Sequence, residues 1–142
     1  MTKSELAKKY FTDGCNCSQA VALAFKEELN MSEDDIKALT VGLGGGIARL
    51  RLTCGAVSAM VMVISYAKCR NLSKLDAYAL IQKACKEFTD EVGSLVCADL
   101  LDGIPVKPGV VPEERTPEFY KKRPCADLVA LAAQIADKYV NL

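Results

Sequence analysis

Apolar residues recur every three or four positions along most of this chain, and this spacing most constrains its fold. One such series runs from Leu75 to Val92 and another from Leu128 to Tyr139, whereas strand-like alternation is scarce. A period of three to four residues gathers apolar side chains on one face of an α-helix. The sequence therefore predicts an all-α fold, a bundle of about six to seven helices.

Short polar residues that can cap a first helical turn precede most of these segments. The candidate caps are Asn16, Ser32, Thr53, Ser73 and Ser94. We expect helices over Lys3–Tyr10, Cys17–Leu29, Glu33–Val41, Cys54–Lys68, Lys74–Glu91, Leu95–Leu101 and Pro124–Val140.

Proline and glycine mark two irregular segments. All five prolines lie after Leu101, which predicts an extended crossover interrupted at most by a short turn from Pro117 to Lys122. The other segment is Gly42-Leu43-Gly44-Gly45-Gly46, where glycine permits positive φ angles or close backbone approach. With 142 residues and no internal repeat, residues 1–142 are expected to form a single domain.

Composition excludes several classes of function. The 18 basic residues balance 18 acidic ones, so a nucleic-acid partner has no electrostatic support. The stretch Thr53–Ala67 is shorter than the roughly 20 residues of a membrane span, so we expect no membrane partner. Without a signal-like apolar run near Met1, we expect a cytoplasmic location. The absence of histidine excludes histidine-based catalysis and histidine-ligated metals.

Seven cysteines remain as the chemically distinctive residues. In a reducing compartment, cysteines serve more often as metal ligands or redox groups than in structural disulfides. Four of them open predicted helices, where the helix dipole lowers a thiol's pKa, and three of these, Cys17, Cys97 and Cys125, are in phase with apolar neighbours. The four helix-start thiols are Cys17, Cys54, Cys97 and Cys125. A shared internal site requires that these four thiols converge in space.

The remaining cysteines have simpler interpretations. Cys69 and Cys85 are expected to pack as small apolar residues. Cys15 stands in Cys15-Asn16-Cys17, where a strained disulfide, a shared metal and mere proximity are all open alternatives.

The groups near the helix-start cysteines also have two interpretations each. The glycines Gly44, Gly45 and Gly46 form either a helix-ending turn or a wall whose amides donate hydrogen bonds to cluster sulfurs or an anion. Basic residues precede Cys54 and Cys125, and we expect solvated surface charge, with compensation of thiolate charge as the alternative. These residues are Arg49, Arg51, Lys121, Lys122 and Arg123.

Taken together, these motifs resemble the prokaryotic C_GCAxxG_C_C family of proteins described as redox-active. The resemblance rests on Asn16-Cys17-Ser18-Gln19-Ala20-Val21, Gly44-Gly45-Gly46, Thr53-Cys54-Gly55-Ala56, Cys97 and Cys125, and covers nearly the whole chain. The chain departs from the pattern in reading Cys54-Gly55-Ala56, and in having Ala59 where a glycine is expected. The family resembles the C-terminal part of split-Soret cytochromes, which implies redox chemistry or a cysteine-ligated iron–sulfur cluster.

Three hypotheses follow. The leading one is an electron-transfer protein holding an iron–sulfur cluster, of the [2Fe–2S] type, by Cys54, Cys97 and Cys125 with Cys17 as the fourth ligand. The second is a metal-free thiol–disulfide oxidoreductase. The third is a zinc-bound or thiol-lined helical module that binds a partner. A redox partner protein is implied but not identified, and a homodimer is an open alternative.

Overall fold

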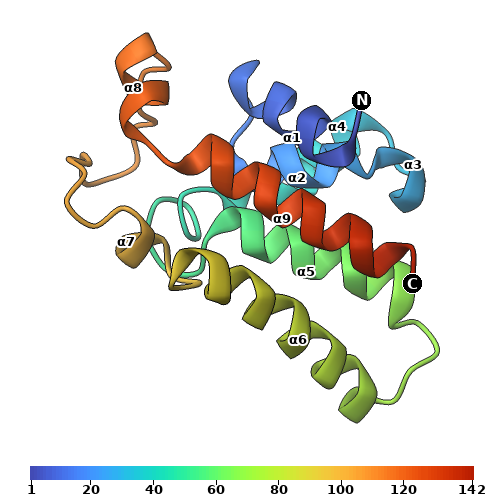
Figure 1. Cartoon of the computed structure of the whole chain (residues 1–142). Coiled ribbons are helices and arrows are strands. Elements are labelled where there is room, and N and C mark those ends of the chain that lie inside the picture. The colour runs from blue at the N-terminus through green and yellow to red at the C-terminus, as the bar shows by residue number, and fades with distance from the viewer.

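The computed structural model describes all residues 1–142 and contains helices but no strands (Figure 1). The α-helices are α1 (Lys3–Thr12), α2 (Cys17–Ala24), α3 (Lys26–Leu29), α4 (Glu33–Thr40), α5 (Gly55–Lys68), α6 (Lys74–Val92), α7 (Cys97–Leu100), α8 (Pro117–Lys122) and α9 (Cys125–Val140). A short 3-10 helix, η1 (Val41–Leu43), follows α4. The predicted all-α class is confirmed.

Four helices build the core. Helix α9 packs against α1, α2 and α5, and α2 also packs against α1 and α5. Their inner faces bury large apolar side chains such as Phe11, Leu23, Met60 and Tyr139. The long helix α6 packs against α5 and α9 along one side of this core (Figure 1). Each buried side chain of this size stabilises the fold by about 1.5–3 kcal/mol.

Capping explains where several helices begin. Asn16, Ser32 and Ser73 accept hydrogen bonds from amides in the first turns of α2, α4 and α6, as predicted. The expected caps Thr53 and Ser94 are wrong, because α5 and α7 are preceded by Cys54 and Val96 and neither helix has a side-chain cap. The starts of α5 and α7 are instead held by backbone hydrogen bonds between their flanking segments.

Three segments differ from the predicted helices. The expected helix Cys17–Leu29 is interrupted at Phe25, whose ψ of 26° leaves the helical range, so it forms α2 and α3. The expected helix Leu95–Leu101 is shorter in the structure, where only α7 is helical. Leu95 and Val96 instead pair with the backbone of Cys54 and Thr53. The expected turn from Pro117 to Lys122 is a helix, α8, with proline at its first turn and Thr116 as its cap.

Candidate functional site

The starts of α5 and α9 lie at the same end of the bundle as α7 (Figure 1). Residues from these three helices line a cavity of about 470 Å³. Its lining includes all four cysteines that stand at helix starts: Cys17, Cys54, Cys97 and Cys125. The glycines Gly44, Gly45 and Gly46 line the same cavity. Cys17, Cys97 and Cys125 are the first residues of α2, α7 and α9, and Cys54 immediately precedes α5. Segments that are distant in sequence thus bring their thiols to one place.

Backbone hydrogen bonds tie the segment that contains Cys54 to the segment that contains Cys97. The Cys54 amide donates to the Leu95 carbonyl oxygen at 2.8 Å, and the Cys97 amide donates to the Leu52 carbonyl oxygen at 2.6 Å. Between them, Thr53 and Val96 form an isolated antiparallel bridge. Both thiols are buried, and neither forms a disulfide. The backbone pairing of their two segments is what holds them beside the cavity.

Helix packing brings together the second pair, Cys17 and Cys125. Helix α2 lies against α9, and the two thiols are close enough for each to shift the pKa of the other. Cys125 is buried and Cys17 is half-buried. Backbone pairing thus holds the segments of Cys54 and Cys97 side by side, and the contact of two helices brings Cys17 near Cys125.

The environment separates the pKa values of these thiols. The hydrogen bond from Cys17, with the nearby guanidinium of Arg123, lowers the pKa of Cys125 to about 7. The same contact with Cys125, and removal from water, raise the pKa of Cys17 well above its usual value. Burial raises the pKa of Cys54 to about 11, although the amides of Val57 and Ala56 act in the opposite direction. A helix start alone does not lower a thiol's pKa here, because desolvation opposes the dipole.

Backbone geometry makes the glycine segment more than a helix-ending turn. Residues Gly45–Arg49 are five consecutive residues with positive φ, between 45° and 72°. Each non-glycine residue in this left-handed region carries strain of about 1–2 kcal/mol. The amides of Gly45 and Gly46 make no hydrogen bond within the protein. Strained backbone with free donors is typical of ligand sites.

Close contacts explain two of the glycines. A Cβ atom on Gly46 would lie 2.8 Å from the Cβ of Cys97 and 2.6 Å from the Leu52 amide nitrogen. A Cβ atom on Gly44 would lie 2.2 Å from the side-chain nitrogen of Asn16, which donates to the Val41 carbonyl oxygen. The glycine segment is thereby packed against the start of α2 and against Cys97.

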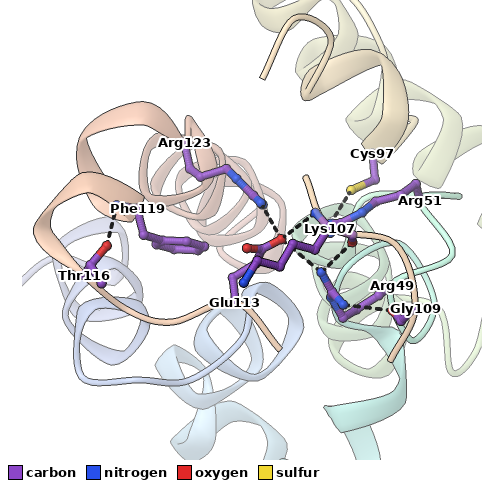
Figure 2. A network of polar contacts seen from close by, with 9 residues as sticks. All are labelled: Arg49, Arg51, Cys97, Lys107, Gly109, Glu113, Thr116, Phe119 and Arg123. Carbon is purple, nitrogen blue, oxygen red and sulfur yellow. Dashed lines mark hydrogen bonds and ion pairs between the residues drawn. The ribbon is translucent and has the colours of Figure 1, made fainter. Parts of the chain in front are cut away.

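Charged side chains cover the cavity on the side of the proline-rich crossover. Arg49 and Arg123 each pair with one oxygen of Glu113 at 3.0 Å, and the Lys107 amide donates to the same oxygen at 3.1 Å (Figure 2). That amide and the two guanidinium groups lower the pKa of Glu113. The side chains of Arg49 and Arg123 are only 12% and 7% exposed, so their interpretation as solvated surface charge is wrong. Lys121 and Lys122 are exposed, as expected.

Two further arginines reach the cavity. Arg115 donates to the carbonyl oxygens of Phe11 and Cys15, both at 2.9 Å, and its guanidinium lies over the rings of Phe11 and Phe119. Arg51 donates from Nη1 toward the Cys97 sulfur at 3.8 Å (Figure 2). The Arg51 Nη2 atom is buried and has no hydrogen-bond partner.

The sequence of this chain matches one protein-family model. The family model described as "Putative redox-active protein (C_GCAxxG_C_C)" matches residues 15–139. The chain belongs to the C_GCAxxG_C_C family. No curated relative and no solved structure matches the sequence. The match spans every cysteine and glycine named above as lining the cavity, so the redox description of the C_GCAxxG_C_C family applies to the chain that builds this cavity.

Other chemical features of this C_GCAxxG_C_C protein are limited. No group of three or more histidine, cysteine, aspartate or glutamate side chains is arranged to hold a single metal ion. Cys69 follows the last residue of α5, Cys85 lies within α6 with its pKa raised by burial, and Cys15 does not line the cavity. No helix has the length and apolar character needed to cross a membrane.

Sequence reasoning missed Glu113 and Arg115 as cavity residues. Both lie in the proline-rich crossover, which gave no helical register to place them. The available signal was the charge run Glu113-Glu114-Arg115 within a segment that must return to the start of α9.

Proposed function

We propose that this redox protein transfers electrons through a [2Fe–2S] cluster held by Cys17, Cys54, Cys97 and Cys125. The observation that carries the proposal is that these four thiols line one cavity. A [2Fe–2S] cluster takes four cysteine thiolates, two on each iron. When bound, such a cluster supplies one-electron chemistry.

The remaining cavity residues fit a cluster chemically. The lining carries four arginines and one carboxylate, so its positive charge complements thiolates and sulfides. Arg51 already approaches the Cys97 sulfur, and hydrogen bonds to sulfur are a protein's means of adjusting a cluster's potential. Burial of Cys54, Cys97 and Cys125 limits contact of the sulfurs with water.

The test is anaerobic purification and reconstitution, followed by a visible spectrum and analysis of iron, sulfide and zinc. We expect iron and sulfide with charge-transfer absorption, and their loss in Cys54→Ala and Cys125→Ala. Cys85→Ala is the matched control, because this thiol lies in α6 away from the cavity. Protein that lacks iron after reconstitution, or that binds stoichiometric zinc instead, would contradict the proposal.

The contact between Cys17 and Cys125 favours a second candidate, a thiol–disulfide oxidoreductase. The Cys125 thiolate would attack a disulfide of a partner protein, forming a mixed disulfide and releasing one partner thiolate. The Cys17 thiolate would then attack the Cys125 sulfur, closing the Cys17–Cys125 disulfide and releasing the second partner thiolate. The two thiols lose two protons and two electrons, and the partner disulfide is reduced.

Mass spectrometry of the metal-free protein tests this candidate. After treatment with a small linear disulfide such as oxidised glutathione, we expect a crosslink between the peptides containing Cys17 and Cys125. Cys17→Ala should stop the reaction at a mixed disulfide on Cys125, whereas Cys15→Ala should form the crosslink normally. Oxidation spread evenly over all seven cysteines would contradict it.

A further inference from the structure

One guanidinium in the cavity, that of Arg51, has an N–H donor without a hydrogen-bond partner. Arg49, Arg115 and Arg123 each direct their guanidinium groups to carbonyl or carboxylate oxygens of the protein. Arg51 instead makes one long contact, from Nη1 to the Cys97 sulfur, and its buried Nη2 has no partner. A buried donor without an acceptor is costly, so the unpaired Nη2 of Arg51 beside a cavity points to an acceptor that the protein itself does not supply.

Unpaired backbone amides accompany this guanidinium. The Arg51 amide donates to the Gly45 carbonyl oxygen at 3.1 Å, which places the start of the left-handed segment close to Arg51. The amides of Gly45 and Gly46 have no partner in the protein. Successive amides in turns, such as that of Gly45 and Gly46, form concave sites that bind anions.

The cavity is larger than a cluster requires. A [2Fe–2S] cluster adds two irons and two sulfides, four atoms in all, to the cysteine sulfurs. A volume of about 470 Å³ lies within the range of pockets that hold small organic molecules. Beyond the thiols, the lining includes Leu100, Leu101, Val110, Phe119 and Leu128. These side chains offer apolar surface for a carbon skeleton.

We propose that the cavity binds a small organic carboxylate, whose oxygens Arg51 and the amides of Gly45 and Gly46 hold beside the thiols. The guanidinium fork matches two carboxylate oxygens, and the excess of arginines over Glu113 favours a negatively charged ligand. The apolar lining favours an organic anion over a bare inorganic one. This inference deepens the proposed redox function by naming the ligand class of the same cavity.

Calorimetric titration of the reduced, metal-free chain tests the inference. The probes are acetate, butyrate and benzoate, with benzyl alcohol as the uncharged analogue of benzoate and inorganic phosphate as an anion without carbon. We expect one molecule of butyrate or benzoate to bind per chain, about tenfold or more tighter than benzyl alcohol or phosphate. Carboxylates that bind no better than benzyl alcohol would overturn the inference, and phosphate binding as tightly would overturn its organic part.

Two matched variants test whether the carboxylate binds at Arg51. Arg51→Gln should weaken benzoate binding about tenfold or more. Arg70→Gln should leave it unchanged, because it removes the same charge from an exposed residue beyond the other end of α5. Equal binding by wild type and Arg51→Gln overturns the assignment. If Arg51→Gln does not fold, the wild-type comparison of benzoate with benzyl alcohol still decides.

Iron and sulfide are measured on the same preparations, which separates the two proposals. A chain that binds benzoate but never iron refutes the cluster and leaves the carboxylate site standing. A chain that holds iron and sulfide but binds no carboxylate refutes only the carboxylate site.

Discussion

Neighbouring side chains distinguish the thiols of this cavity from one another. Cys125 has a pKa of about 7 because Cys17 and Arg123 stabilise its thiolate, whereas burial raises the pKa of Cys54 to about 11. Position at a helix start was visible in the sequence, but the neighbours that decide the pKa were not. At the scale of single residues, the sequence identifies the candidate reactive thiols but not the order of their pKa values.

We predict that alkylation of Cys125 in the reduced, metal-free protein rises with pH around a midpoint of about 7. A thiol reacts as its thiolate, so the rate increases as pH rises through the pKa. Cys54 should react only as the pH approaches about 11. Labelling with iodoacetamide over a pH series, read by peptide mass spectrometry, measures both midpoints.

Two variants complete this experiment. Cys17→Ala removes the largest cause of the lowered pKa and should move the Cys125 midpoint upward, toward the ordinary thiol value near 9. Cys15→Ala removes the thiol two residues before Cys17 in the sequence. This thiol does not line the cavity, so the variant should leave the Cys125 midpoint unchanged. An unchanged midpoint in Cys17→Ala would show that Cys17 does not set the pKa.

We predict that Gly46→Ala lowers the free energy of unfolding by about 2–5 kcal/mol. The new Cβ atom would meet the Leu52 amide and the Cys97 Cβ at a φ of 72°. Gly93→Ala is the matched control, since its φ is 93° but nothing lies within 4 Å of the added atom. That variant should lose only about 1–2 kcal/mol, the cost of left-handed backbone. Equal losses in urea unfolding would contradict the close approach at Gly46.

At the scale of elements, the proline-rich crossover is held to the rest of the protein through Glu113. Its carboxylate joins Arg49, which follows the glycines, to Arg123, which precedes α9. The sequence predicted an extended crossover here but not which charges it would bury, because proline-rich segments lack the periodicity that assigns a residue to a face. Only the folded path shows that these groups meet.

We predict that Glu113→Gln lowers the free energy of unfolding by about 1–3 kcal/mol, because two largely buried guanidinium groups lose their carboxylate. Glu114→Gln is the matched control, since this neighbouring side chain is exposed. Urea denaturation at pH 7 measures both variants. Similar effects of the two changes would show that the Glu113 pairs do not stabilise the fold.

The loss of stability in Glu113→Gln is predicted to depend on pH. The pKa of Glu113 is lowered from 4.5, so its stabilising contribution is complete above about pH 4.5 and is lost as the pH falls through the lower native value. The difference in unfolding free energy between wild type and Glu113→Gln should therefore shrink below about pH 4.5. A difference that stays constant from pH 6 to pH 3 would contradict the lowered pKa.

At the scale of the whole molecule, the all-α class and most helix positions were predictable because apolar periodicity records which face is buried. The split at Phe25 and the short α7 were not, since both depend on contacts between segments distant in sequence. The hypothesis of a shared site assumed that the four helix-start thiols converge and left the glycines open between a turn and a wall, whereas the left-handed backbone at Ile47 and Ala48 was not predicted at all. Ordinary side chains carry no local signal for such strain.

Hydrogen exchange should reflect this organisation. We predict the slowest exchange in α1, α2, α5 and α9, which form the core, and fast exchange through much of the crossover between α7 and α8. The Cys54 and Cys97 amides should exchange slowly for residues at helix starts, because each donates to the facing segment. The amide of Asp34 in the first turn of α4 is a suitable comparison, since it has no such partner. Fast exchange at both cysteines would contradict the pairing.

The position of α9 in the chain has a consequence for biosynthesis. A ribosome making about 5–20 residues per second reaches Cys97 several seconds or less before it completes Cys125 and α9. During that interval three of the four thiols exist without the helix that packs over α1, α2 and α5. A nascent chain therefore presents unpaired thiols to other cellular thiols and metals before it can enclose them. The cavity closes only after translation has passed the last of its cysteines.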